Sequence, residues 1–190
     1  NSPESEFANL ERLADADLMV VYTRFRVLPD PQMRMILSYL DSGRPVVGLK
    51  TANHAFKFPE ESPYSEWNLG FGQKVLGAPW RTHYGGSYGT TVKQVPDMAK
   101  HPVLNGVDPS FRVRSWLYHV LPLTGECEPL LIGSTEDPEK DSSTDNPVAW
   151  LSSHNGARVF YTSMGHSEDF EVPSFVRLLK NGISWALEVS

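Results

Sequence analysis

The chain has 190 residues, 40% of them hydrophobic, which is enough to bury the core of one domain. Its formal net charge of −6 argues against a nucleic-acid-binding protein, because phosphate contacts require clustered Lys and Arg. No apolar stretch approaches the roughly 18 residues that span a bilayer. The single cysteine, Cys127, excludes an internal disulfide and a multi-cysteine metal site. It leaves the compartment open between cytoplasm, periplasm and secretion.

The first half of the chain alternates between predicted helices and buried strands. Apolar residues recur at helical spacing over residues 6–14 and predict a short amphipathic helix. Residues 18–22 and 45–49 are continuous apolar runs, which are typical of strands buried on both faces of a parallel sheet. Between them, Asp30 as N-cap and Pro31 as first residue predict a helix. This order predicts parallel pairing through a right-handed crossover.

The middle of the chain is less regular. Residues 59–90 combine Pro and Gly with many aromatic residues, too many for a disordered linker. They predict an ordered insertion over one end of the sheet, with a short helix near residues 68–76. Further strands are expected at residues 90–96, 112–119, 129–133 and 147–152.

The most informative stretch is residues 158–168. A buried-strand pattern stops abruptly there and delivers His166, Ser167 and Glu168 at the C-terminal end of the strand, before a helix over residues 173–187. Ligands of open α/β sheets bind at this edge. His166 is therefore a candidate general acid or base that Glu168 orients. The alternative is a loop histidine without a role.

Five segments, taken in order, resemble the trehalose-utilisation (ThuA-like) family of the class I glutamine amidotransferase-like superfamily. They are residues 17–26, 45–54, 101–106, 147–150 and 156–166. The resemblance covers nearly the whole chain. It implies an α/β fold, a flavodoxin-like three-layer α/β/α sandwich with a mainly parallel sheet, as a single domain over residues 1–190. It also implies a bacterial protein of carbohydrate metabolism.

The chain departs from this superfamily at the nucleophile. Class I amidotransferases place a cysteine on the turn after the strand that corresponds to residues 45–49, whereas this chain has Lys50 there. Lysine cannot form the glutamyl thioester, and Cys127 lies on another segment. The resemblance therefore does not extend to glutaminase activity.

The N-terminus is the second departure. The family opens with a central first strand and a helix, and residues 1–6 cannot provide that strand. Either the chain is truncated or cleaved, or another polypeptide supplies the strand, as a second copy or a different chain. Because a sheet without it would leave backbone groups unpaired, we expect something to fill its place.

The residues that follow the predicted strands are the candidate site. Lys50 is interpreted as a desolvated amine that acts as a base or binds a carbonyl, or else as an exposed cation at a helix N-terminus. His54 is a second group for polarising a carbonyl. Arg24 and Arg26 alternate in direction, so one of them suffices to hold a carboxylate or sugar hydroxyls; salt bridges to Asp are the alternative. The full set of predicted substrate-binding residues is Arg24, Arg26, Thr51, Asn53, His83, Tyr118 and His119.

Four histidines, His54, His83, His119 and His166, could converge on one crevice. A divalent metal is one interpretation, but no His-x-x-x-His or Cys/His spacing supports it, and no nucleotide-binding motif is present. Proton transfer by histidine is favoured, because its ordinary pKa lies near neutral pH.

Three hypotheses remain. The first is an enzyme on a sugar or keto-sugar, of hydrolase, lyase or isomerase type. The second is a carbohydrate-binding module that has lost its chemistry, and the third is a structural subunit of an assembly.

Overall fold

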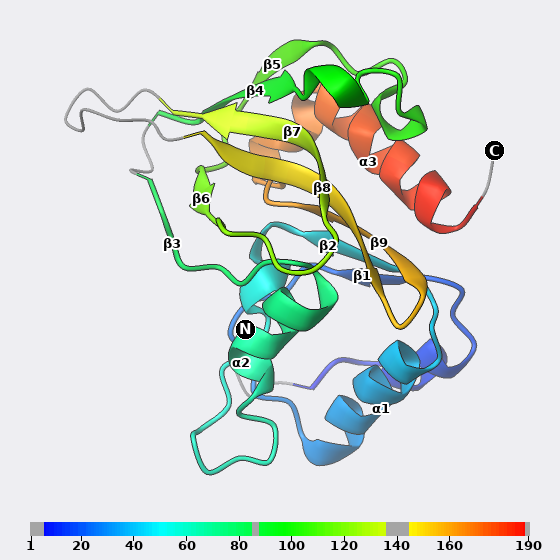
Figure 1. Ribbon diagram of the computed structural model, residues 1–190. Helices are drawn as coiled ribbons and strands as arrows, with labels where there is room; N and C mark the ends of the chain where they lie inside the picture. The colour runs from blue at the N-terminus through cyan, green and yellow to red at the C-terminus, as the bar shows by residue number, and fades with distance from the viewer. Residues whose placement is uncertain (1–5, 85–87, 136–144, 189–190) are drawn as a thin grey trace.

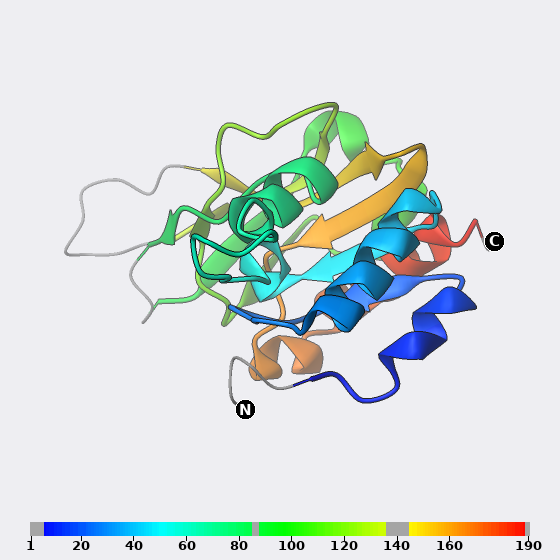
Figure 2. The ribbon, with the colours of Figure 1, turned by 90° about the horizontal axis from the view of Figure 1, so that it is seen from below.

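The structure, a computed structural model, describes residues 6–84, 88–135 and 145–188. Within them, seven strands form one sheet with helices on both faces (Figures 1 and 2). In spatial order the strands are β1 (Met19–Val21), β2 (Val46–Leu49), β9 (Ala157–Thr162), β8 (Asn146–His154), β7 (Glu128–Ser134), β4 (Thr90–Gln94) and β5 (Ser110–Val113). The α/β sandwich predicted from the sequence is confirmed.

The strand directions decide where a site can form. β1, β2 and β9 pair in parallel, and every pairing from β9 outward to β5 is antiparallel. β8 and β4 run opposite to β1, β2 and β9. Because β7 and β5 are each antiparallel to one of these two strands, they run in the same direction as β1, β2 and β9. Among the seven described strands, five therefore share one direction, although only two pairings are parallel. The C-terminal ends of β1, β2, β9 and β5 open at the same edge of the sheet.

The first crossover has the predicted form. Helix α1 (Asp30–Asp41) links β1 to its parallel neighbour β2 and buries Met33, Ile36 and Leu40. One detail of the prediction is wrong: Pro29 is the N-cap, and Asp30 is already helical. The Asp30 carboxylate instead binds the Tyr64 hydroxyl and Arg34. The helix therefore begins without a side-chain cap.

Two apolar clusters, one on each face, hold the sheet between its helices. On one face, α1, the short helix α2 (Trp67–Gly70) and the π-helical turn η3 (Phe71–Val75) pack with Val46 and Tyr161. On the other face, α3 (Pro173–Ala186) packs Phe175 with Val47 and Phe160 (Figure 1). The alternation of Val46 and Val47 between the two clusters follows from the twofold period of a strand. Burial on both faces explains the continuous apolar run of β2. The same prediction is wrong for β1, where Val20 is 51% exposed because the strand lies at the edge of the sheet.

The remaining short elements lie outside the main sheet. β3 (Thr82–His83) and β6 (Tyr118–His119) form a two-stranded antiparallel sheet within the described residues. The 3₁₀ turns are η1 (Leu10–Ala14), η2 (Lys50–His54), η4 (Pro96–Met98), η5 (Pro102–Leu104) and η6 (Ser167–Glu171). Part of the aromatic-rich insertion, residues 85–87, lies outside the described residues.

One predicted strand is wrong, and one predicted helix is shorter than expected. Residues 112–119 are not one strand: β5 ends at Val113, because the amides of Arg114 and Ser115 bind the Asp169 carboxylate instead of a neighbouring strand. The short helix predicted over residues 6–14 is present only over Leu10–Ala14, as a 3₁₀ helix whose Leu10 and Leu13 pack against the core. Asn9, with a left-handed φ of 57°, stops any helical path from reaching further back.

The unpaired edge of the sheet lies at β1. The sequence predicts that another segment or chain fills the place of the absent first strand. In the structure β1 pairs directly with β2, and within the described residues the other side of β1 has no strand partner. The predicted lack of a first strand concerns residues 1–6, of which residues 1–5 lie outside the described part. No helix in the described residues is long and apolar enough to cross a membrane.

Candidate functional site

A cavity of about 340 Å³ opens at the edge where β1, β2, β5 and β9 end. Its volume lies near the lower end of the range for ligand pockets, roughly 300–1,000 Å³. The wall comes from the loops after these strands and from the small β3–β6 sheet. Its lining residues are Arg24, Phe25, Lys50, Thr51, His54, Trp80, His83, Arg114, Trp116, Tyr118 and His166.

Two of the lining residues have strained backbone. Phe25 has a φ of 51° and Lys50 a φ of 47°, both in the left-handed region that side chains disfavour. Each lies in the loop after a parallel strand: Phe25 after β1 and Lys50 directly after β2. Such strain costs about 1–3 kcal/mol per residue and persists only where the surroundings impose it. Functional sites are where such residues cluster.

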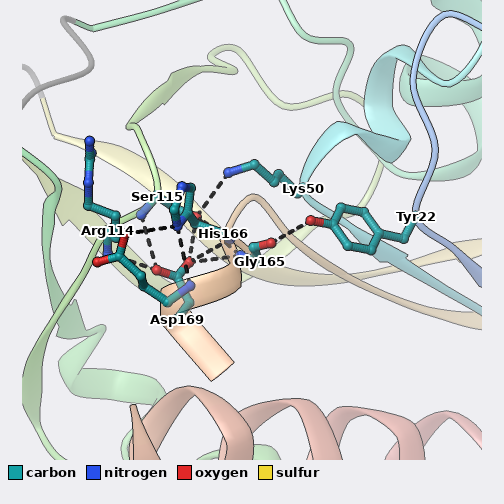
Figure 3. Close-up of polar contacts among 8 residues, drawn as sticks. Tyr22, Lys50, Arg114, Ser115, Gly165, His166 and Asp169 are labelled. Carbon is teal, nitrogen blue, oxygen red and sulfur yellow. Dashed lines mark hydrogen bonds and ion pairs between the residues drawn. The ribbon is translucent and has the colours of Figure 1, made fainter. Parts of the chain in front are cut away.

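A buried carboxylate organises the floor of the cavity (Figure 3). Asp169 is completely buried, and its Oδ1 accepts hydrogen bonds from the amides of Arg114 (2.7 Å) and Ser115 (3.1 Å). Its Oδ2 accepts from the Ser115 hydroxyl (2.5 Å) and from the amides of Gly165 (2.9 Å) and His166 (3.0 Å). One side chain therefore joins the loop after β5 to the loop after β9.

Ser115 extends this network to Lys50. The Lys50 ammonium donates to the Ser115 oxygen at 3.3 Å, and the same oxygen accepts from the His166 amide at 3.0 Å (Figure 3). Burial lowers the pKa of Lys50, the Asp169 carboxylate opposes this effect, and Arg114 adds to it. The result is an amine at the cavity floor that gives up its proton more readily than an exposed lysine.

His54 is held as a neutral imidazole. Burial, followed by the charges of Arg24, His83 and Lys50, lowers its pKa to about 4. Its Nδ1 lies 2.8 Å from Asn53 Oδ1, an acceptor, so the network assigns the proton to Nδ1. Nε2 then carries the lone pair and acts as an acceptor near neutral pH.

His166 has two competing partners on its own turn. Its Nδ1 accepts from the Glu168 amide at 3.3 Å, which places the neutral proton on Nε2. The Glu168 carboxylate oxygen lies 3.7 Å from the same Nδ1, which is an ion-pair distance and too long for a hydrogen bond. The orienting role of Glu168 therefore stays a prediction, and its side chain is 63% exposed.

Aromatic rings form the wall opposite the sheet. The His54 and Trp80 ring centroids are 4.7 Å apart, and His83 lies 4.5 Å from Trp116. Trp116 remains 39% exposed, so part of its face is available to a ligand. Burial raises the pKa of Tyr118 to about 12, which keeps its hydroxyl protonated.

The structure brings seven of the eleven predicted site residues to this cavity: Arg24, Lys50, Thr51, His54, His83, Tyr118 and His166. The other four, Arg26, Asn53, His119 and Glu168, do not line it. Arg26 is buried with its guanidinium over the Phe7 ring. Asn53 is also buried, and its side-chain oxygen lies 2.8 Å from His54 Nδ1. The His119 ring stacks on Tyr84 at 3.7 Å.

Sequence reasoning missed Asp169 and Ser115. Asp169 stands next to the more conspicuous Glu168, and Ser115 lies inside a segment predicted as a strand. The bond that joins them is not visible in the sequence, because Ser115 and Asp169 are 54 residues apart. In the described residues, no group of three or more His, Cys, Asp or Glu side chains could hold a metal ion.

Comparisons with known proteins agree with this fold. The sequence model of the family described as trehalose utilisation (ThuA) matches residues 1–186. The chain has no match among curated proteins. Similar solved structures include ThuA-like proteins from Bacteroides uniformis, with a TM-score of 0.66, and Parabacteroides merdae, with a TM-score of 0.64.

Both of these structures are 20% identical to the chain, cover 93% and 92% of it, respectively, and are each covered over 71% of their own length. A β-galactosidase from Bacillus circulans shares the fold over 88% of this chain and 23% of its own, at 10% identity and a TM-score of 0.53. These likenesses show the fold.

Proposed function

Because the chain belongs to the trehalose utilisation (ThuA) family, we propose that it acts on a sugar or keto-sugar by acid–base chemistry at His166. The reaction would be of hydrolase, lyase or isomerase type. One observation carries the proposal. Titratable side chains from several loops, among them Lys50, His54 and His166, converge on a single cavity whose wall holds two strained residues.

The environment of His166 suits a group that both takes and returns a proton. The Glu168 amide favours the neutral form with its proton on Nε2, which donates into the cavity. The Glu168 carboxylate, 3.7 Å from Nδ1, favours the form with the proton on Nδ1, whose Nε2 is a base. Since one turn supports both states, His166 can exchange a proton with a ligand at Nε2.

Lys50 is placed to bind a carbonyl oxygen. In the proposed step, His166 removes a proton from the carbon next to the carbonyl, and the electron pair moves to the carbonyl oxygen. The Lys50 ammonium then stabilises the negative charge on that oxygen. His54, a neutral acceptor, would orient a sugar hydroxyl. For an isomerisation, the hydroxyl proton of the deprotonated carbon moves to the former carbonyl oxygen, and His166 returns its proton to the former carbonyl carbon. For an elimination, the enolate instead expels a hydroxyl group, as water, from the carbon beyond the deprotonated one, and His166 supplies the proton.

Deuterium exchange tests this chemistry without knowledge of the final product. A panel of keto-sugars (fructose, sorbose and tagatose) is incubated with the protein in D₂O, and incorporation next to the carbonyl is followed by NMR. We expect exchange that falls about 100-fold or more in His166→Gln. His154→Gln is the matched control, because His154 binds the Lys74 carbonyl outside the cavity and should exchange normally. Equal rates in wild type and His166→Gln would contradict the proposal.

The aromatic wall favours a second candidate, a carbohydrate-binding module without catalysis. Trp80 and Trp116 offer ring faces on which a sugar can stack. In this case sugar affinity survives His166→Gln and falls in Trp116→Ala, and no keto-sugar exchanges deuterium. Calorimetric titration with the same sugars distinguishes the two candidates.

We also propose that a second copy of the chain pairs with the outer edge of β1. The Met19 amide binds the Pro45 carbonyl beside β2, so the neighbouring Val20 amide points to the open side. Val20 and Tyr22 are about half exposed there, beside a mainly apolar groove lined by Phe7, Leu10 and Leu13. An edge paired with its own copy about a twofold axis forms a self-complementary contact.

Val20→Pro tests this edge, because it removes only the outward amide and leaves the pairing with β2 intact. Analytical ultracentrifugation should show a dimer for wild type and a monomer for Val20→Pro. A monomeric wild type would contradict the pairing.

A further inference from the structure

The cavity carries one sign of charge. Its lining includes the cations Arg24, Lys50 and Arg114 together with three histidines, and no Asp or Glu of the described residues lines it. The chain as a whole is acidic, with a formal net charge of −6. The cations come from three separate loops, after β1, β2 and β5. A positively charged cavity in a negatively charged protein attracts anions.

The Asp169 carboxylate below the cavity offsets part of the positive charge at Lys50 but is not exposed on the cavity surface. Asp169 is completely buried, and its two oxygens already accept five hydrogen bonds from the floor. Glu168, on the same turn, does not line the cavity. Among the described residues, neither Arg24 nor Lys50 forms a salt bridge. Both cations can therefore bind a group that enters from solvent.

The pKa of His54 reflects the same positive charges. The charges of Arg24, His83 and Lys50 act with burial to hold His54 neutral. Burial penalises a charge of either sign, so only the contribution of these neighbouring charges favours an anion.

On the premise of the proposed function, the geometry points to a sugar ligand that carries an oxyanion, either a carboxylate or a phosphoryl group, bound by Arg24 and Lys50. The guanidinium of Arg24 offers two parallel N–H donors that match either oxyanion. The Lys50 ammonium donates one hydrogen bond to Ser115 and has two further N–H groups for the ligand. A neutral sugar would leave the charge of Arg24 without an anionic partner and bind more weakly.

Matched sugar pairs test this inference. Glucose, glucuronate and glucose 6-phosphate share one ring and differ in the presence and kind of oxyanion. Acetate and inorganic phosphate supply the oxyanions alone. Calorimetric titration of the full chain should give an affinity for one anionic sugar at least tenfold above that for glucose, and the affinity should fall as salt is added. Which of the two anionic sugars binds tighter separates carboxylate from phosphoryl recognition.

Three variants assign the effect to Arg24. This residue is exposed, so its replacement should not disturb folding. Arg24→Gln should weaken the anionic sugar roughly tenfold or more, leave glucose unchanged, and remove most of the salt dependence. Arg24→Lys, which keeps the charge, should recover part of the affinity. Arg12→Gln removes the same charge from the exposed turn η1 and should change nothing.

The outcomes separate this inference from the proposed function. If glucose and the anionic sugars bind equally, and Arg24→Gln leaves both affinities unchanged, the inferred oxyanion recognition is wrong, whereas the cavity is still a sugar site. If acetate or phosphate alone binds as tightly as its sugar, the sugar plays no part, and the proposed function is wrong together with this inference. If none of the probes binds, both are contradicted.

Discussion

The two sides of the sheet are stabilised in different ways. On the side of β7 and β8, fully buried apolar residues such as Leu130, Leu131 and Trp150 fill the interior. At the ends of β1, β2 and β9, the chain instead holds the strained residues Phe25 and Lys50 and a buried carboxylate. Strain and buried charge both cost stability, so the antiparallel side stabilises a fold that the site destabilises. Substitutions on the two sides should therefore differ in their effects.

The largest effect is expected in the antiparallel core. Leu130 in β7 is completely buried, and Leu130→Ala should lower the free energy of unfolding by about 2–5 kcal/mol. Urea unfolding measures this loss. Ligand affinity of the protein that remains folded should be unchanged, because Leu130 does not line the cavity. Loss of binding without loss of stability would break the comparison.

Asp169 tests whether the floor of the site depends on one carboxylate. Asp169→Asn places an amide group against backbone amides that need acceptors, and it should cost roughly 3 kcal/mol. It should also release the loops after β5 and β9, with loss of ligand binding. Glu168→Gln is the control: its exposed side chain predicts a change within about 0.5 kcal/mol. Equal losses in both variants would contradict the assignment of the floor to Asp169.

The lowered pKa of His54 predicts how the free energy of unfolding depends on pH. The folded state lowers its pKa from an ordinary 6.5 to about 4. Because the unfolded state takes up the proton first, the contribution of His54 is complete above pH 6.5 and is lost as pH falls towards 4. Relative to His54→Gln, wild type should lose about 2 kcal/mol between pH 7.5 and pH 5. Parallel stability curves for the two proteins would contradict a neutral buried imidazole.

The smallest effect concerns backbone strain. The difference in stability between a glycine and an alanine variant should have opposite signs on the two sides. At Lys50, with a φ of 47°, Lys50→Gly should be about 1 kcal/mol more stable than Lys50→Ala, because both lack the side chain and only glycine tolerates this backbone. At Lys93, exposed on β4, the glycine variant should be the less stable one by about 0.5–1 kcal/mol. Thermal unfolding of the four variants measures both differences. The same sign at both positions would show that Lys50 is not strained.

The sequence predicts the first two strands and their crossover because apolar runs mark the strands, although only β2 of these two is buried on both faces. The apolar runs at residues 18–22 and 45–49 hold β1 and β2, and the strand near His166 ends where predicted. The same rule, that side chains after parallel strands meet at one edge, brings Lys50, His54 and His166 together.

What the sequence does not reveal depends on contacts between distant segments. The break between β5 and β6 is caused by Asp169, about 55 residues further on, and the local pattern still looks like one strand. Likewise, His119 has the residue type of a site histidine, but the pairing of β6 with β3 stacks it on Tyr84 outside the cavity.

The histidines allow one direct test of the central claim that the cavity is the ligand site. The chain has six histidines, and His54, His83 and His166 line the cavity, whereas His101, His119 and His154 do not. Each can be assigned by substitution in an NMR spectrum of ¹³C-labelled imidazoles, and glucuronate and glucose 6-phosphate are then titrated in. Shifts confined to the three cavity histidines are the predicted result. Shifts only at the other three, or none with either sugar, would contradict the account.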